Sequence, residues 1–213
     1  MNAAGIQAKI NRGEGIAAAT LGTPYDQYRP AGTGAPLVSG NHLGVLNCWA
    51  QQDFDFRSRR PNLYGHPVWA LLCDRTLLAV GDYIQGAEGI FFVIAMQALT
   101  ATAAVSCNQI VTVSRPTEGA PGANYYGGVQ TTTPIITAWP ASVLQGTKGE
   151  RGDVNLPGDV RAPWVAILLP AGTPQIRSGD IVTDAQAIPM RYVVSGAEQT
   201  DLGYRITAAQ AMA

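Results

Sequence analysis

PVWALL at 67–72, GDYI at 81–84 and IFFVI at 90–94 recur in the same order about a hundred residues later. The second set reads PWVAILL at 163–169, GDIV at 179–182 and MRYVV at 190–194. Each set combines a short apolar strand, a Gly-Asp turn that opens a second strand, and a third strand of aromatic and β-branched residues. The offset grows from 96 at the first strand to 100 at the third, so the loops differ while the strands keep their order. This repetition predicts two small β-domains in tandem.

The two Gly-Asp pairs, Gly81-Asp82 and Gly179-Asp180, are interpreted as structural turns. Glycine permits a positive φ at such a turn. The aspartate side chain can accept hydrogen bonds from backbone amides that the turn leaves unpaired. The following strand is then held in register, so we assign both aspartates to the architecture rather than to catalysis.

The expected fold is mainly β, with two tandem small β-barrels or sandwiches and an N-terminal helical arm. Residues 2–21 have helical character, because Ile6, Ile10 and Ile16 roughly follow helical spacing among alanines, and Gly22 is placed as the C-terminal cap. The predicted parts are a helical arm with an extended segment (1–30), a Gly/Pro/Ser-rich linker (31–44), a first β-domain (45–116), an inter-domain loop (117–129) and a second β-domain (130–213).

Residues 104–116 are expected to close the first domain as a strand. Val105, Cys107, Gln109, Val111 and Val113 share one face of this strand, and the opposite face also contains an isoleucine. Apolar residues on both faces indicate a strand that lies between a core and a neighbour.

The composition suggests a protein with much covered surface. Only 14% of the 213 residues are charged, against 46% that are hydrophobic, whereas soluble domains average about 25% charged residues. We interpret this as surface covered by other subunits; a small β-protein rich in Thr, Ser and Gln is the alternative. The net charge of −1 provides no basic field for nucleic acid or membrane. The sequence has no apolar run long enough for a transmembrane helix and no N-terminal signal pattern, so the chain is expected to start in the cytoplasm.

Catalytic patterns are missing from the sequence. The two histidines, His42 and His66, adjoin no nucleophile motif, and no nucleotide-binding glycine pattern, nucleophile elbow or zinc-helix motif occurs. The three cysteines have no zinc-ligand spacing and are expected to be buried free thiols. We therefore expect no catalytic residue, cofactor or metal. Two alternatives stay open, a Cys73–His66 pair and a carboxylate pair drawn from Asp53, Asp55, Asp74 and Asp82.

Contacts with other subunits are expected at apolar, aromatic and basic side chains of the arm and loops. The candidates are Ile6, Ile10, Ile16, Tyr25, Tyr28, Arg29, Arg57, Arg59, Arg60, Tyr125, Tyr126, Lys148 and Arg151. The four tryptophans, Trp49, Trp69, Trp139 and Trp164, allow a second interpretation as stacking platforms for a glycan or nucleic acid. Because Trp69 and Trp164 are taken as corresponding positions within apolar strands, core packing is favoured.

Two sets of passages resemble proteins of tailed phages. SGDIVTD at 178–184, followed by RYVV at 191–194, resembles a hairpin of small β-barrel proteins that occur in head-to-tail joining and related tail components. Parts of 10–30, together with CNQIVTVSRP at 107–116, are similar to structural proteins encoded in phage tail and baseplate regions. These passages cover about a third of the chain.

The resemblance implies a non-enzymatic virion protein, assembled in the host cytoplasm, that forms a homo-oligomeric ring in the tail. Because the chain is about twice as long as one joining barrel and has an additional arm, an adaptor at or near the baseplate is favoured. Such an adaptor links the tail tube or sheath to hub or wedge proteins, with no membrane and no specific nucleic acid as partner. A head-to-tail connector or collar subunit is the nearest alternative. A carbohydrate- or nucleic-acid-binding module and a cell-wall hydrolase are rivals from other classes.

Overall fold

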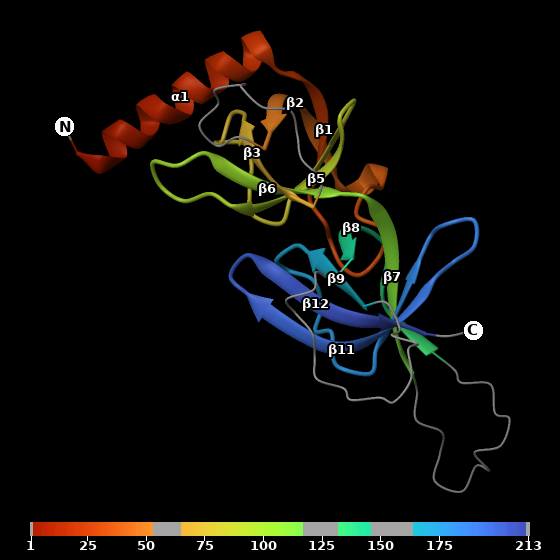
Figure 1. Cartoon of the computed structure of the whole chain (residues 1–213). Coiled ribbons are helices and arrows are strands. Elements are labelled where there is room, and N and C mark those ends of the chain that lie inside the picture. Colours follow the sequence, from red (N-terminus) through yellow and green to blue (C-terminus); the bar gives the residue numbers. More distant parts are fainter. Residues whose placement is uncertain (1, 53–64, 117–131, 146–163, 212–213) are drawn as a thin grey trace, which may run out of the picture.

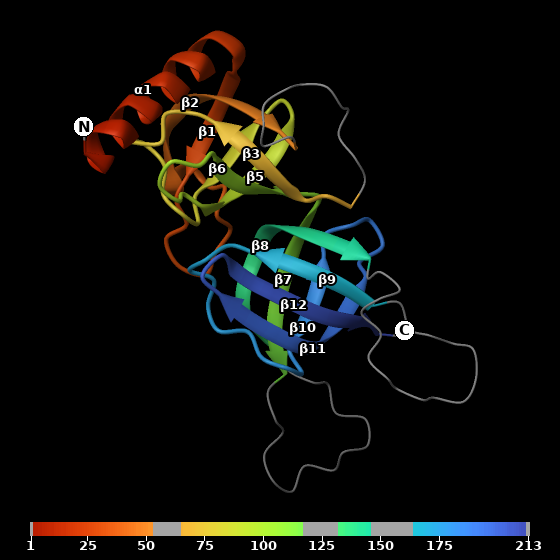
Figure 2. The same cartoon turned by 60° about the vertical axis from the view of Figure 1, so that its left-hand side comes forward.

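A computed structural model describes residues 2–52, 65–116, 132–145 and 164–211. In this part of the chain an N-terminal helix, α1 (Ala3–Leu21), is followed by two closed β-barrels of six strands each. The helix, barrel 1 and barrel 2 follow one another along the molecule in both views (Figures 1 and 2). The expected mainly β fold with tandem barrels and a helical arm is confirmed.

Barrel 1 has the strand order β1-β2-β3-β6-β5-β4 and closes where β1 pairs with β4. Its strands are β1 (Thr23–Tyr28), β2 (His42–Gln51), β3 (Val68–Leu72), β4 (Tyr83–Gly86), β5 (Gly89–Ala95) and β6 (Thr102–Cys107). A short 3-10 helix, η1 (Ser39–Asn41), precedes β2.

Barrel 2 repeats this topology strand for strand, since its order is β7-β8-β9-β12-β11-β10 and β7 pairs with β10. Its strands are β7 (Gln109–Pro116), β8 (Thr132–Gln145), β9 (Trp164–Leu169), β10 (Ile181–Asp184), β11 (Arg191–Thr200) and β12 (Gly203–Gln210). The register also shifts at equivalent places, between Val93 and Ala95 in β5 and between Val194 and Gly196 in β11. The internal repeat is therefore a repeat of whole barrels.

The expected domain boundaries need correction. Residues 23–28, which we assigned to the arm, form β1 and pair with both β2 and β4. The expected linker 31–44 contains η1 and the start of β2. Barrel 1 thus spans 23–107 rather than 45–116, and barrel 2 spans 109–210 rather than 130–213. Polar residues and Pro24 in β1 conceal its pairing, which depends on strands distant in sequence.

The expected strand across 104–116 is two strands that belong to different barrels. β6 ends at Cys107 and β7 begins at Gln109. Asn108 is the one residue between these two strands, so the chain passes from barrel 1 to barrel 2 through a single residue. The apolar residues on both faces have the expected cause, since β6 lies between the core of barrel 1 and barrel 2.

Helix α1 lies on barrel 1 and buries few of its residues completely. Ala18 is its buried residue, while Ile6 and Ile16 are 37% and 59% exposed. Gly22 ends the helix as expected, with its N–H donating to the Ala18 carbonyl oxygen, but its φ of −82° is extended. Glycine is needed for space, because a Cβ would stand 2.7 Å from the carbonyl oxygen of Cys48. The helix therefore docks mainly through small and polar residues, while Ile10 is half-buried and Ile6 and Ile16 are exposed.

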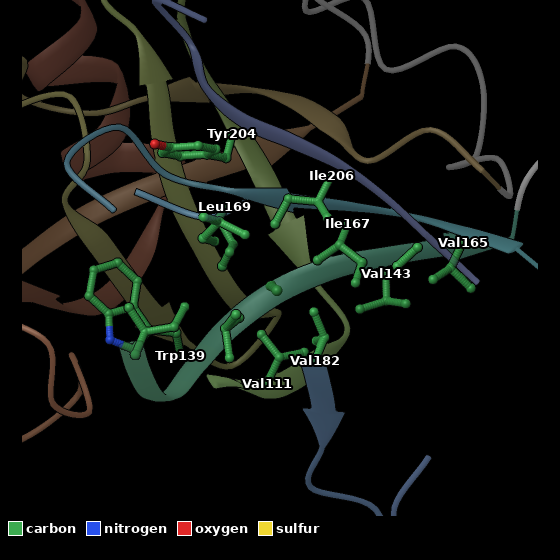
Figure 3. Close-up of a cluster of buried hydrophobic side chains, with 14 of the residues drawn as sticks. Val111, Trp139, Val143, Val165, Ile167, Leu169, Val182, Tyr204 and Ile206 are labelled. Atoms are coloured by element: carbon green, nitrogen blue, oxygen red, sulfur yellow. The ribbon is translucent and has the colours of Figure 1, made fainter. Parts of the chain in front are cut away.

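Each barrel has an apolar interior. The barrel 1 interior includes Tyr25, Leu71 and Phe91, all fully buried. The barrel 2 interior runs from Trp139 to Val165 and is drawn in Figure 3. The barrel 2 cluster continues into barrel 1 through residues on the outside of that barrel, namely Tyr83, Phe92, Ile94 and Val105. One continuous cluster thus joins the two barrels.

Candidate functional site

In the Gly-Asp turn of barrel 1, the buried Asp82 forms an ion pair with the half-exposed Arg29. Gly81 has a φ of +91°, and the Asp82 carboxylate accepts the N–H of Ala79 at 2.8 Å. Both predicted features of the turn are confirmed. Arg29, the residue after β1, donates from Nε and Nη2 to the two Asp82 oxygens at 2.7 and 2.8 Å, and Gln27 Nε2 donates at 2.7 Å. This two-point contact fixes the end of β1 to the start of β4.

Barrel 2 has the same arrangement. Gly179 has a φ of +90°, and Asp180 accepts the N–H of Arg177 at 2.8 Å. Arg115 donates from Nε and Nη2 to Asp180 at 2.8 and 2.9 Å. Hydrogen bonding to these aspartates raises the pKa of Arg29 and of Arg115, so both guanidinium groups remain charged. The duplicated Arg-Asp pair is a structural clamp in each barrel.

Sequence reasoning missed the arginine partners of the two aspartates. A signal was present, because each arginine precedes a proline at the end of the first strand of its barrel. Arg29-Pro30 comes directly after β1, and Arg115-Pro116 ends β7. Their spacing of 86 residues differs from the spacing of the Gly-Asp pairs. The equivalence of the two Arg-Pro pairs becomes visible only once β1 and β7 are recognised as equivalent strands.

The joint between the barrels is held by Asn108. Its backbone N–H donates to Ala141 O at 3.0 Å. Its side chain donates to Val143 O at 2.8 Å and accepts the Val143 N–H at 2.7 Å. The side chain thus pairs with the backbone N–H and carbonyl of Val143 in β8 as a neighbouring strand would. These bonds restrain the orientation of the one-residue connection between the barrels.

Aromatic residues complete the joint. The buried Tyr83 hydroxyl donates to Pro140 O at 2.9 Å, and its ring meets Trp139 edge to face at 6.3 Å. Burial raises the pKa of Tyr83 well above its ordinary value, which keeps the phenol as a donor. Trp139 Nε1 donates to Gly34 O at 2.8 Å, and the Thr137 N–H donates to Thr33 O at 3.0 Å. The segment after β1 therefore also contacts barrel 2.

An open cleft of about 540 Å³ lies beside the joint. Residues of both barrels line it, and its surface is mainly apolar. The lining residues are Ile90, Cys107, Asn108, Gln109, Ile110, Ala185 and Gln186.

The expected subunit-interface residues lie in different environments. Tyr25 is fully buried in barrel 1, where its hydroxyl donates to Glu88 at 3.2 Å, so it is not available to a neighbouring subunit. Tyr28 is half-buried and packs on the His42 ring at 5.2 Å. Ile10 is half-buried on α1, and Arg29 is held by Asp82. The remaining basic and aromatic candidates, Arg57, Arg59, Arg60, Tyr125, Tyr126, Lys148 and Arg151, lie outside the described residues.

The residues considered for catalysis have structural contacts. Asp82 belongs to the clamp, and Asp74 accepts the N–H and hydroxyl of Thr76 at 3.0 and 2.6 Å. Cys73 is buried beside Cys48, and a hydrogen bond between the two thiols together with burial raises the pKa of Cys48. Asp53 and Asp55 lie outside the described residues. Within the described ranges, no three His, Cys, Asp or Glu side chains gather as a metal-ligand group.

The four tryptophans are buried or half-buried rather than fully exposed to solvent. Trp139 is fully buried, and Trp69 is half-buried with its ring 5.4 Å from Phe91. Trp49 and Trp164 are half-buried as well. The correspondence expected between Trp69 and Trp164 needs correction, because the ladders place Trp69 opposite Ala104 and its equivalent, Val165, opposite Ala208.

Glu14 is the least satisfied charged group where α1 meets barrel 1. Its Oε2 is buried without a hydrogen bond, and Arg75 Nε is 4.0 Å away. The guanidinium of Arg75 instead donates to the carbonyls of Thr100 and Gln97, each at 2.7 Å. Burial raises the pKa of Glu14, and the positive charge of Arg75 opposes this only in part.

A fall in pH is therefore expected to strengthen the docking of α1. A carboxyl group with a raised pKa binds protons more readily when the helix is docked. The free-energy cost of docking the helix with a charged Glu14 is complete well above the raised pKa, and it disappears as the pH falls below the ordinary pKa of 4.5. Hydrogen exchange of the α1 amides should slow on going from pH 7 to pH 5, after correction for the intrinsic rates. Glu14→Gln should show slow exchange already at pH 7 and a weaker pH dependence; an unchanged profile would contradict this account.

Large apolar side chains are exposed on several elements. Leu43 and Val45 of β2 are 53% and 63% exposed, and Ile16 and Leu21 of α1 have similar exposure. On barrel 2, Val193 of β11 is 42% exposed. The exposed apolar surface thus includes the helix side of the molecule and the outside of barrel 2.

The fold and its contacts define a protein of two tandem six-stranded barrels with duplicated Arg-Asp clamps. No protein-family model, curated protein or solved structure shows significant similarity to the chain. No helix among the described residues has the length and apolar character needed to span a membrane.

Proposed function

We propose that this chain is a non-enzymatic structural subunit that self-associates into a ring in a phage tail, at or near the baseplate. There it acts as an adaptor between the tail tube or sheath and hub or wedge proteins. The head-to-tail connector or collar is the alternative position for the same kind of subunit. The resemblance of the 178–194 hairpin to phage barrel proteins supports the virion context.

The observation that carries the proposal is the contact between the two barrels. The outside of β4, β5 and β6 meets the region of β8 around Trp139 and Pro140, so two different surfaces of equivalent domains are in contact. A contact of this heterologous type, repeated between chains, generates a closed ring or an open filament. Exposed apolar residues such as Val45 and Val193 provide surface for further contacts of this kind.

The main rival, a glycan- or nucleic-acid-binding module, would require exposed aromatic platforms. Trp139 lies in the barrel joint, and Trp69 packs against Phe91. These positions favour packing over stacking with a ligand.

Light scattering coupled to size-exclusion chromatography, with electron microscopy of the same fractions, tests the proposal. We expect the purified chain to self-associate in a concentration-dependent manner and to form closed rings at high concentration. A monomer at every concentration, or binding of a glycan or oligonucleotide by that monomer, would contradict the proposal. Zymography on cell-wall material should be blank, since activity there would support the hydrolase instead. A neighbouring gene for a tape measure or spike protein would support the tail context.

A further inference from the structure

Barrel 1 contacts barrel 2 through one outer face. We define the docking face of barrel 1 as the outward side chains of Tyr83, Phe92, Ile94 and Val105 on β4, β5 and β6. None of these residues is more than 8% exposed, and all belong to the apolar cluster of barrel 2. Aromatic groups of this size contribute much of the apolar area at such a contact.

Barrel 2 has an equivalent docking face that is partly exposed. In barrel 1, Phe92 pairs with Tyr83 on one side and with Val105 on the other. In barrel 2, Val193 pairs in the same way with Ile181 and Ala209, so Val193 is the equivalent of Phe92. Phe92 is 1% exposed, whereas its equivalent Val193 is 42% exposed. In both views β11 lies on the side of barrel 2 away from barrel 1 (Figures 1 and 2).

The surface of barrel 2 that receives barrel 1 includes Ala141 and Ala171. Ala141 O accepts the Asn108 N–H, and a Cβ on Gly81 would stand 2.9 Å from Ala171 O. The equivalent positions in barrel 1 are Cys48 and Arg75. Cys48 pairs with the first residue of β1 as Ala141 pairs with the first residue of β7. Arg75 follows Leu71 of β3 at the same spacing as Ala171 follows the equivalent Ile167 of β9.

Helix α1 occupies this equivalent surface of barrel 1. Gly22, at its end, lies against Cys48 O, and a Cβ on Gly15 would stand 3.7 Å from Asp74 Cβ. Glu14 is the neighbour of Arg75. The helix therefore takes on barrel 1 the position that barrel 1 takes on barrel 2.

The helix covers this surface less completely than a barrel does. Only Ala18 of α1 is fully buried, whereas the docking face of barrel 1 buries two aromatic rings. Glu14 Oε2 is buried without a hydrogen bond, and Ile16 remains 59% exposed. Leu43 and Val45, further along β2 from Cys48, are also exposed.

We propose that α1 is a displaceable cap, and that the docking face of barrel 2 from a second copy of this chain takes its place on barrel 1. The chains are then joined head to tail, and each contact between chains repeats the contact between barrels within a chain. This inference rests on the self-association in the proposed function and identifies the surfaces that carry it. A second copy can bind only to molecules in which α1 is undocked. The apparent dissociation constant of self-association therefore equals the intrinsic constant divided by the fraction of molecules with an undocked helix.

Release of the helix is therefore expected to tighten self-association. Ala18→Glu places a charge at the one fully buried position of α1 in the full-length chain, and Ala19→Glu makes the same change at the exposed neighbouring position. In sedimentation-velocity series, Ala18→Glu should lower the apparent dissociation constant at least about tenfold, whereas Ala19→Glu should leave it within about twofold. Circular dichroism at the start of each series verifies that the barrels remain folded.

A second substitution tests the partner surface. Val193→Asp charges the docking face of barrel 2, and Leu202→Asp is a control in the β11–β12 turn with the same 42% exposure. Ala18→Glu/Val193→Asp should be monomeric, while Ala18→Glu/Leu202→Asp should still associate. At a concentration where the wild type alone is monomeric, mixing it with Ala18→Glu/Val193→Asp should give a one-to-one complex, because the wild type supplies an intact docking face to the open surface of the variant. A contact between two identical surfaces would not be restored by this mixing.

The outcomes separate this inference from the proposed function. If the wild type forms rings but neither Ala18→Glu nor Val193→Asp changes its association, the inference is wrong and the ring proposal stands. If Ala18→Glu forms open filaments that Val193→Asp abolishes, the inference stands and the ring proposal is wrong. If neither the wild type nor Ala18→Glu associates, both are wrong.

Discussion

Replacement of Asp82 by alanine is expected to lower the free energy of unfolding of barrel 1 by about 2–3 kcal/mol. The Asp82 carboxylate is 1% exposed and accepts four hydrogen bonds, two from Arg29 and one each from Gln27 and Ala79. The loss should remain below the 3–5 kcal/mol typical of a broken buried pair. Arg29 is 49% exposed and can turn its charge towards water. Urea denaturation followed by tryptophan fluorescence measures the change.

Two control variants separate the clamp from the turn. Arg29→Ala keeps the Gln27 and Ala79 donors but leaves the 1% exposed Asp82 carboxylate without a counter-charge, so its cost should be comparable to that of Asp82→Ala. Asp180→Ala in barrel 2 removes three hydrogen bonds rather than four, and its loss should be smaller than that of Asp82→Ala. Equal stability of Asp82→Ala and the wild type would show that the clamp contributes nothing to barrel 1.

Replacement of Trp139 by alanine is expected to cost about 3–5 kcal/mol and to uncouple the two barrels. Trp139 is the largest fully buried side chain, and it lies at the end of the cluster in Figure 3. Its removal eliminates the edge contact with Tyr83 and the hydrogen bond to Gly34, both of which cross between the barrels. Calorimetry should show one cooperative transition for the wild type and two for Trp139→Ala.

Trp69→Ala is the matched control for this variant. Trp69 packs on Phe91 inside barrel 1, away from the joint. Its loss should lower the stability of barrel 1 and leave the contact between the barrels intact. Tyr83→Phe should weaken the contact between the barrels less than Trp139→Ala and more than Trp69→Ala. It removes only the hydrogen bond from the Tyr83 hydroxyl to Pro140 O, worth about 1 kcal/mol. A single transition for Trp139→Ala with a loss below about 1 kcal/mol would contradict its assigned position in the joint.

The sequence predicted the repeated strands because their signals are local. β3, β4 and β5, and their equivalents in barrel 2, are dense in apolar and β-branched residues, and each middle strand follows a Gly-Asp turn. β1 lacks such a signal, because it contains Pro24 and the polar Asp26 and Gln27. Its strand identity depends on pairing with β2 and β4. The boundary of barrel 1 was misplaced for this reason.

The candidate surfaces were only partly predictable. The sequence indicated an arm with apolar residues, and Ile16 is indeed largely exposed. It did not indicate that the helix docks through Ala18 and Glu14, since the docked face is set by the surface of barrel 1. Tyr25 was assigned to an interface, although β1 directs it into the core. An aromatic residue in a short polar segment gives no local sign of the direction its side chain takes.

Local sequence patterns were enough to predict two small β-domains and their Gly-Asp turns, because turn geometry and strand patterning depend on neighbouring residues. The folded structure was needed to show that both domains are closed barrels opened by the equivalent strands β1 and β7, that Arg29 and Arg115 clamp the turns, and that α1 lies on barrel 1 where barrel 1 lies on barrel 2. Each of these contacts joins residues that are distant in the chain. Barrel closure brings them together, and no local pattern encodes their proximity.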